Sequence, residues 1–175
     1  MGGIRVYTLR TSKKAGPPPL ILGWREWAAL PGLGVDAVKA KLDTGARTSS
    51  LHAFDMERFQ RDGNAMVRFE IHPEQRSREG AVEVEAEVVD ERWVRNSGGA
   101  RELRPVIETE VRLAEKSWII ELTLTRRDEM GFRMLLGRQA LRKRAVVDPG
   151  SSYRAGRRRK KKRKKKNNGI GRTRR

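Results

Sequence analysis

Apolar side chains alternate with polar ones through most of the central part of the chain, and this period of two limits the folds that the chain can adopt. The alternation is clearest over residues 65–72, 82–88 and 118–124. It is typical of strands that bury one face and expose the other. A further strand is expected over 106–113, entered after Pro105, and one short helix over about 137–143. The sequence therefore predicts a small all-β domain, closed as a barrel or packed as a sandwich.

The composition excludes several classes of protein. A chain of 175 residues has room for one domain of ordinary size, since single cores organise roughly 100 to 200 residues. It has no cysteine, which removes disulfide scaffolds, thiol nucleophiles and cysteine-ligated metals. His52 and His72 lie outside the HExxH spacing, so a zinc site within one chain would lack ligands. We also find no GxGxxG or Walker A loop, and we expect neither a metal nor another cofactor.

The hydropathy of the chain argues against contact with a membrane. No run approaches the roughly 18 to 20 apolar residues that a membrane span needs, and the N-terminus lacks the apolar core of a signal peptide. A cytoplasmic protein is therefore expected.

The positive charge is concentrated at one end. Residues 151–175 hold 14 of the 40 basic residues and no acidic one, so the net charge of +18 falls to +4 for the rest of the chain. Residues 157–166 are all Arg or Lys, and such a block cannot nucleate a packed element. We expect a disordered tail over 151–175, a flexible segment over 1–19 and a folded domain over 20–150. The tail is either a solubilising extension or an anchor for a polyanion such as ribosomal RNA.

One short motif has chemical meaning. The apolar residues of 38–42 form one face of an expected strand, which delivers Asp43 to its end, and Thr44 and Gly45 follow in a tight turn. An Asp-Thr-Gly turn is also found as an ordinary Asx turn, in which the side chain caps its own backbone. Its context here is a second apolar strand at 134–136, which ends in Gly137 and Arg138 and opens the short helix.

These two segments together resemble the retropepsin-type aspartic peptidases. Further motifs look like a bacterial family named for ATP-dependent zinc proteases, which has a retropepsin-like fold and some of whose members are encoded beside the ligase that adds glutamates to ribosomal protein S6. The matching motifs lie at residues 23–27, 30–31, 40–53, 104–109 and 135–138. The resemblance covers roughly 20–150 and neither end of the chain. It implies a closed retropepsin-like barrel or sandwich with one short C-terminal helix.

The resemblance also implies a mechanism in which two carboxylates share one proton and activate water. This chain has one Asp-Thr-Gly, so the simplest completion is a homodimer in which Asp43 of each copy meets at the axis. Thr44 would brace the paired loops, while Gly45 and Ala46 keep them compact. Gly137 would be small so that the second strand can pass behind the Asp43 loop.

The expected substrate-binding residues surround this motif. They are Ala46, Arg47, Gly98, Gly99, Arg104, Gly137 and Arg138. Residues 93–104 are expected to cover the substrate with Gly98 and Gly99 at a hairpin tip, the alternative being an exposed loop without a catalytic part.

Arginine side chains hint at the substrate, because they grip carboxylates in a bidentate fashion. Those on or beside expected strands are Arg47, Arg104, Arg126, Arg127, Arg133 and Arg138. Most could be surface arginines, and we single out Arg47 and Arg138 as exceptions. We expect His52 to be structural, and Trp24 and Trp27 to be core or dimer-contact aromatics.

The leading hypothesis is a dimeric aspartic endopeptidase that acts on acidic or glutamate-modified protein tails. One alternative is a non-catalytic β-domain that binds the ribosome or nucleic acid through its basic tail. Another is a metal-dependent protease.

Overall fold

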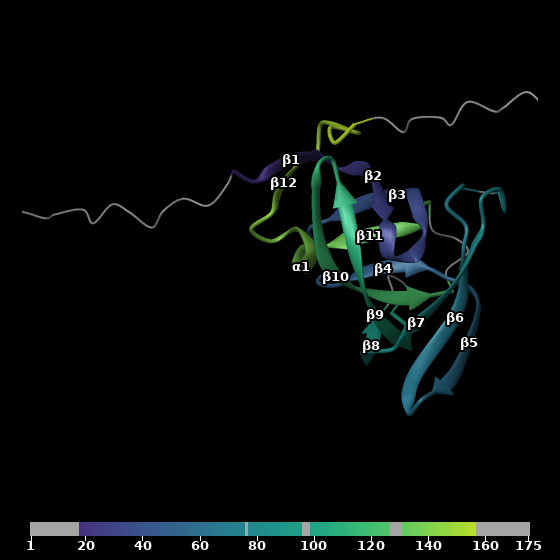
Figure 1. The fold of residues 1–175 in the computed structure, drawn as a ribbon. Coiled ribbons are helices and arrows are strands. Elements are labelled where there is room, and N and C mark those ends of the chain that lie inside the picture. Colours follow the sequence, from purple (N-terminus) through teal and green to yellow (C-terminus); the bar gives the residue numbers. More distant parts are fainter. Residues whose placement is uncertain (1–17, 76, 96–98, 127–130, 157–175) are drawn as a thin grey trace, which may run out of the picture.

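The computed structural model describes residues 18–75, 77–95, 99–126 and 131–156. Most of the expected N-terminal segment and residues 157–175 of the expected tail lie outside these ranges. In the described residues the chain forms twelve strands, one 3₁₀-helix and one short α-helix (Figure 1). These are β1 (Leu20–Gly23), β2 (Arg25–Leu30), η1 (Pro31–Leu33), β3 (Val35–Asp43), β4 (Ser49–His52), β5 (Phe54–Arg61), β6 (Asn64–Ile71), β7 (Val82–Glu87), β8 (Asp90–Arg95), β9 (Arg101–Leu113), β10 (Lys116–Thr125), β11 (Met134–Gly137), α1 (Arg138–Leu141) and β12 (Ala145–Asp148).

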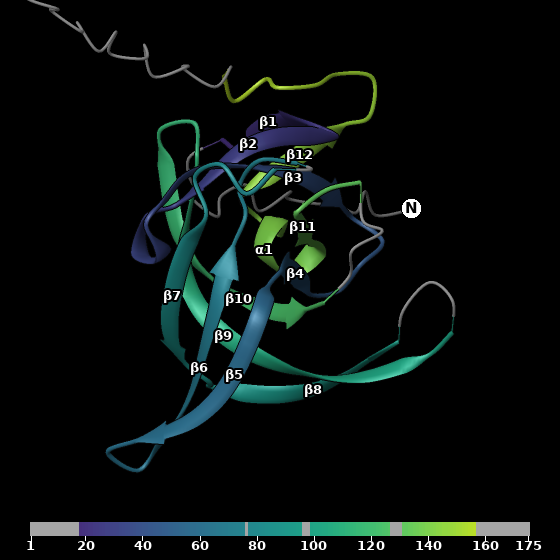
Figure 2. The ribbon, with the colours of Figure 1, turned by 90° about the vertical axis from the view of Figure 1, so that its right-hand side faces the viewer.

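The strands form three sheets, which confirms the all-β prediction. The largest has the order β10-β4-β11-β3-β2-β9-β8, and β10 also pairs with β9, so that six strands follow one another around a ring. β1 and β12 form a parallel pair, and β5, β6 and β7 form an antiparallel sheet. Figure 2 shows the β5–β6 hairpin reaching out beyond the rest of the domain. No helix among the described residues has the length and apolar character needed to span a bilayer.

The period of two predicted β6, β7 and β10 with nearly the observed bounds. Val67, Phe69 and Ile71 on β6 are buried, as the alternation requires. β9 differs from its expected bounds, because it begins at Arg101 and continues through Pro105. The residues on either side of this proline remain in register with β8, so the missing N–H does not end the strand.

β3 and β11 build the centre of the fold. The apolar residues Val38, Ala40 and Leu42 on β3 are buried, and Leu136 on β11 lies in register with Leu42. β11 runs parallel to β3 and antiparallel to β4, so two segments far apart in the sequence share one layer. This register places Gly137 opposite Asp43.

Gly137 lies at a close crossing of the two segments. A Cβ atom added there would be 2.3 Å from the carbonyl oxygen of Thr48 and 2.5 Å from its carbonyl carbon, so no larger residue fits without movement of the backbone. The Gly137 N–H donates to the Ser49 Oγ (3.1 Å). The next two amides, of Arg138 and Gln139, donate to the carbonyls of Ala46 (2.8 Å) and Arg47 (3.1 Å). The loop that follows Asp43 is therefore held by the start of α1.

Residues 148–156, which we call the C-terminal strap, pack against the turn between β1 and β2. Glu26 is fully buried, and its carboxylate accepts hydrogen bonds from the N–H groups of Gly23 (2.6 Å), Arg154 (2.9 Å) and Ala155 (3.1 Å). Trp27 stacks on Tyr153 with ring centroids 6.1 Å apart. The folded part of the chain thus continues beyond residue 150, where the composition suggested that the tail begins.

The strap also reaches the centre of the domain through Trp24. The Trp24 N–H donates to the Ser151 carbonyl (3.0 Å), and the Trp24 carbonyl accepts from the Leu42 N–H (2.9 Å), one residue before Asp43. Gly23 has no space for a side chain, since a Cβ would lie 2.5 Å from the Ser151 carbonyl oxygen. The position of Trp24 therefore depends on the C-terminal strap.

We predict that Gly137→Ala destabilises the domain by at least about 3 kcal/mol, because the new methyl group would overlap backbone atoms that cannot yield. Urea unfolding of the purified variant measures this change. Gly131→Ala is a matched control, since a Cβ at Gly131 meets none of the described residues within 4 Å. Equal stability of the two variants would contradict the tight crossing.

We predict that ending the chain after Gly150 lowers the free energy of unfolding by about 2 to 4 kcal/mol, because the buried Glu26 carboxylate loses two of its N–H donors. Ending the chain after Gly156 keeps those donors and is expected to leave the stability unchanged. Thermal or urea unfolding of both truncated proteins tests this contrast. An equal loss of stability in the two would argue against the stabilising role of the hydrogen bonds to Glu26.

Candidate active site

Asp43 ends β3 and turns its carboxylate back on the following loop. Its Oδ1 accepts the N–H groups of Gly45 (3.1 Å) and Ala46 (3.0 Å), which is the geometry of an Asx turn. Its Oδ2 lies 3.5 Å from the Lys41 Nζ. The side chain is 29% exposed, so one oxygen is held by the backbone while the group stays open to a ligand. Thr44 and Gly45 are exposed at the tip of this loop.

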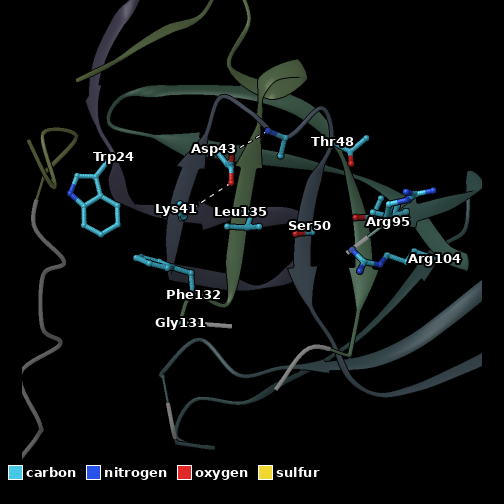
Figure 3. A pocket seen from close by; sticks show the side chains of 13 residues that line it. Trp24, Lys41, Asp43, Thr48, Ser50, Arg95, Arg104, Gly131, Phe132 and Leu135 are labelled. Carbon is cyan, nitrogen blue, oxygen red and sulfur yellow. Dashed lines mark hydrogen bonds and ion pairs between the residues drawn. The ribbon is translucent and has the colours of Figure 1, made fainter. Parts of the chain in front are cut away.

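A cavity of about 630 Å³ lies over Asp43 (Figure 3). Residues that are far apart in the sequence line it: Trp24, Lys41, Asp43, Ala46, Thr48, Ser50, Val94, Arg95, Arg104, Thr123, Gly131, Phe132 and Leu135. This volume lies within the range of sites that bind small molecules or short peptide segments.

One wall of the cavity is aromatic. Trp24 and Phe132 meet edge to face with ring centroids 5.7 Å apart, and the Arg25 guanidinium lies 4.7 Å from the Trp24 ring. Trp24 is half-buried and contributes to the cavity, whereas we expected a core or dimer-contact residue. Trp27 fits that expectation better, because it packs against Tyr153 of the strap.

The charged lining residues are mostly cations. Lys41, Arg95 and Arg104 line the cavity, and Asp43 is the one carboxylate among the described lining residues. Of the predicted substrate-binding residues, Ala46 and Arg104 thus share the cavity with Asp43. The sequence analysis missed Lys41, although the period of two on β3 would have placed it on the same face as Asp43. It also missed Arg95, which no local pattern distinguishes.

A hairpin of β8 and β9 forms the side of the cavity opposite the aromatic wall. Val94 pairs with Glu102 and Arg95 pairs with Arg101, and both Val94 and Arg95 line the cavity. The described arms of the hairpin expected over 93–104 therefore pair with each other, and Gly99 has a left-handed conformation (φ 87°). Gly98 lies outside the described residues.

Arg92 fixes this hairpin to β10. Its guanidinium donates to both carboxylate oxygens of Glu121 (2.6 and 3.0 Å) and to Asp90 (2.6 Å). The hydrogen bond from Arg92 lowers the pKa of the Glu121 carboxyl, and a hydrogen bond from the same arginine lowers the pKa of Asp90. The three groups form an ion-pair cluster, and none of them lines the cavity.

The remaining predicted arginines lie elsewhere. Arg47 and Arg138 are exposed on the loop and on α1, and neither lines the cavity within one chain. Arg126 donates to the Met56 carbonyl (2.8 Å), and Arg133 lies 4.9 Å from the Phe54 ring. Arg127 lies outside the described residues.

Both histidines are buried in a stack of rings, and neither lines the Asp43 cavity. Phe54 lies between His52 and His72, with centroids 4.1 and 3.8 Å away. The His72 Nε2 lies 2.8 Å from a Glu70 oxygen, and the hydrogen bond with His72 lowers the pKa of that carboxyl. The stack supports the structural reading of His52. Within the described ranges, no three His, Asp or Glu side chains gather in a way that could hold a metal ion.

Comparison with known proteins places this geometry in a family. The family model described as RimB-like, "Retropepsin-like aspartic endopeptidase RimB", matches residues 21–158. The match extends from β1 through the C-terminal strap.

Longer curated proteins contain a similar region. A protein of Parasynechococcus marenigrum named "Probable alpha-L-glutamate ligase" is 51% identical over 137 residues, which is 78% of this chain and 29% of that protein. A protein of the same name from Shewanella pealeana is 49% identical over 133 residues, 76% of this chain and 29% of its own length. The chain therefore spans less than a third of the length of these relatives.

A solved structure has a similar fold. It is the crystal structure of Lpg0085, a protein of unknown function from Legionella pneumophila, with a TM-score of 0.65 and 29% identity over 78% of this chain and 98% of the other. The family match, the Asp43 turn and the crossing at Gly137 agree with the resemblance seen in the sequence. The chain belongs to the RimB-like family of retropepsin-like aspartic endopeptidases.

Proposed function

We propose that this protein is an aspartic-type endopeptidase in which Asp43 of two identical copies forms the catalytic dyad. The observation that carries the proposal is the Asp43 carboxylate at the floor of a cavity, with Oδ1 held by two backbone N–H groups. Such fixed acceptor geometry limits the movement of the carboxylate before the reaction. The family match supports the same reaction class.

The second carboxylate has to come from elsewhere. Asp43 is the one acidic residue that lines the cavity among the described residues, and an aspartic mechanism needs two. A two-fold axis beside the exposed Thr44 and Gly45 would bring the two Asp43 side chains together, with Thr44 bracing the loops. The dimer is therefore part of the proposal.

The chemistry follows from the proximity of two like charges. Two carboxylates a few ångströms apart hold one proton between them, because both cannot ionise at once. The ionised group takes a proton from water, which attacks the peptide carbonyl, while the protonated group donates to the carbonyl oxygen. Return of a proton to the amide nitrogen lets the C–N bond break. No other group is required for these steps.

We propose acidic protein tails, including glutamate-modified ones, as the substrate. Among the charged lining residues of the cavity, three cations face one carboxylate, which favours an anionic peptide. The curated relatives are named for alpha-L-glutamate ligation, a reaction that produces such peptides. The ligase name belongs to those longer proteins, and for this chain it supports the substrate class.

We also propose that the basic run at 157–166 contacts RNA or the ribosome. Ten consecutive cations provide salt-dependent affinity for a polyanion through release of counterions. This contact would locate the enzyme without taking part in the cleavage.

We predict that Asp43→Asn lowers peptide cleavage by about 10³-fold or more, because the dyad loses the group that ionises. A library of acidic peptides analysed by mass spectrometry measures the cleavage. Asp36→Asn is a matched control, since Asp36 is exposed on the same strand and outside the cavity. Activity that persists in Asp43→Asn would refute the proposal, and activity that a chelator removes and zinc restores would favour the metal-dependent alternative.

We predict that ending the chain after Gly156 abolishes salt-sensitive binding to single-stranded RNA and leaves peptide cleavage unchanged. Fluorescence anisotropy at several salt concentrations follows the binding. Retention of the full RNA affinity without residues 157–175 would show that the tail is not the anchor.

A further inference from the structure

We propose that Arg104 forms a subsite that binds one carboxylate side chain of the peptide at a fixed place in the Asp43 cavity. The inference rests on the proposed peptidase function and makes it more specific. Attraction by several cations would favour any acidic peptide, whereas a subsite selects a Glu or Asp at one position.

The first observation is a buried donor without an acceptor. The Arg104 side chain is only 4% exposed, although it lines the cavity. Its Nη2 is buried and has no hydrogen-bond partner among the residues that the structure describes. Burial of a charged donor without an acceptor destabilises the free protein. A carboxylate oxygen of a bound peptide would offset this cost by accepting a hydrogen bond from Nη2.

The second observation is that the guanidinium cannot turn away to find a partner. The Arg104 Nε donates to the Glu102 Oε2 (2.7 Å), and the same oxygen accepts from the Thr125 Oγ1 (3.2 Å). Thr125 is fully buried, so its hydroxyl holds the Glu102 carboxylate in a fixed position. The ion pair fixes the plane of the guanidinium and leaves Nη2 available.

Arg92 is an arginine on the neighbouring strand whose guanidinium is paired within the protein, and it can be compared with Arg104. It lies directly across from Arg104 in the register of β8 and β9. The fold provides two carboxylates for Arg92, and both of its Nη atoms are used by Glu121. The described part of the chain supplies no such partner for the Nη2 of Arg104, and a ligand carboxylate would provide the missing acceptor.

The geometry of the cavity then sets the binding direction. In Figure 3, Arg104 and Arg95 enter from one side, and Asp43 and Trp24 lie toward the other, with Leu135 and Ser50 between them. Lys41 lies beside Asp43, on the side of the cavity away from Arg104, so a carboxylate bound by Lys41 would belong to a different position of the peptide. A peptide whose acidic side chain reaches Arg104 would extend across the cavity toward Asp43.

Binding to the Asp43→Asn protein tests the subsite without cleavage. The probes are fluorescein-labelled short peptides of Ala and Ser that carry a single Glu, moved along the peptide, and the same peptides with Gln. We expect Glu at one position to bind about 10-fold more tightly than Gln, the size of a charge-assisted hydrogen bond. Arg104→Gln should reduce this ratio to near one. Arg112→Gln removes an exposed charge from the same strand outside the cavity and should preserve it.

Two further variants guard against misfolding, because Arg104→Gln leaves the Glu102 carboxylate without its ion pair. Glu102→Gln combined with Arg104→Gln removes both charges and should fold while losing the preference. Arg104→Lys keeps the charge but not the planar fork, and should keep only part of the preference. Circular dichroism and thermal unfolding verify that each variant is folded.

Three outcomes would overturn the inference. The preference for Glu could be the same at every position of the peptide, or it could survive in the folded Arg104 variants. The third such outcome is that none of the peptides binds. These outcomes are separate from the test of the proposed function. Cleavage by the wild type without a positional Glu preference would refute the subsite alone. Arg104-dependent Glu binding by a protein that cleaves no peptide would refute the peptidase and leave the subsite in place.

Discussion

The close passage of β11 behind the Asp43 loop is the constraint on which the rest of the structure depends. Gly137 has no room for a Cβ against Thr48, and three consecutive N–H groups from Gly137 onward bind the Ser49 side chain and the carbonyls of Ala46 and Arg47. Two segments that are distant in the sequence are thereby joined at the residue that bears the carboxylate. The loop can then hold Asp43 with only local amides, because its far end is already fixed.

The walls of the cavity come from outside this crossing, and each is fixed by its own buried polar contact. Glu26 binds the C-terminal strap, which positions Trp24, while Glu102 and Thr125 orient Arg104 on the opposite side. A buried carboxylate, Glu26, and a partly exposed one, Glu102, thus define the shape of the site. The Asp43 loop supplies the proposed chemistry, whereas the contacts of Glu26 and Glu102 shape the surfaces that a ligand would touch.

Local patterns were sufficient for the strands with clear alternation and for the strand that ends at Asp43, but not for strands such as β1, β5 and β12. The alternation on β6, β7 and β10 and the positions of Asp43 and Gly137 follow from neighbouring residues, and so they could be predicted. The strap could not, because the role of Glu26 depends on partners more than 120 residues away. The preference for Arg47 and Arg138 over other arginines rested on proximity to the motif, whereas entry to the cavity depends on the pairing of β8 with β9.

The central claim is that one active site contains Asp43 from two copies of the chain. It is tested most directly by mixing wild-type and Asp43→Asn protein under conditions that exchange subunits, and by measuring peptide cleavage against the fraction of wild type. A shared dyad predicts that activity follows the square of this fraction, so an equal mixture retains about a quarter of the wild-type rate if mixed dimers are inactive. Activity that falls in direct proportion to the wild-type fraction would show that each chain works alone and would contradict the shared site.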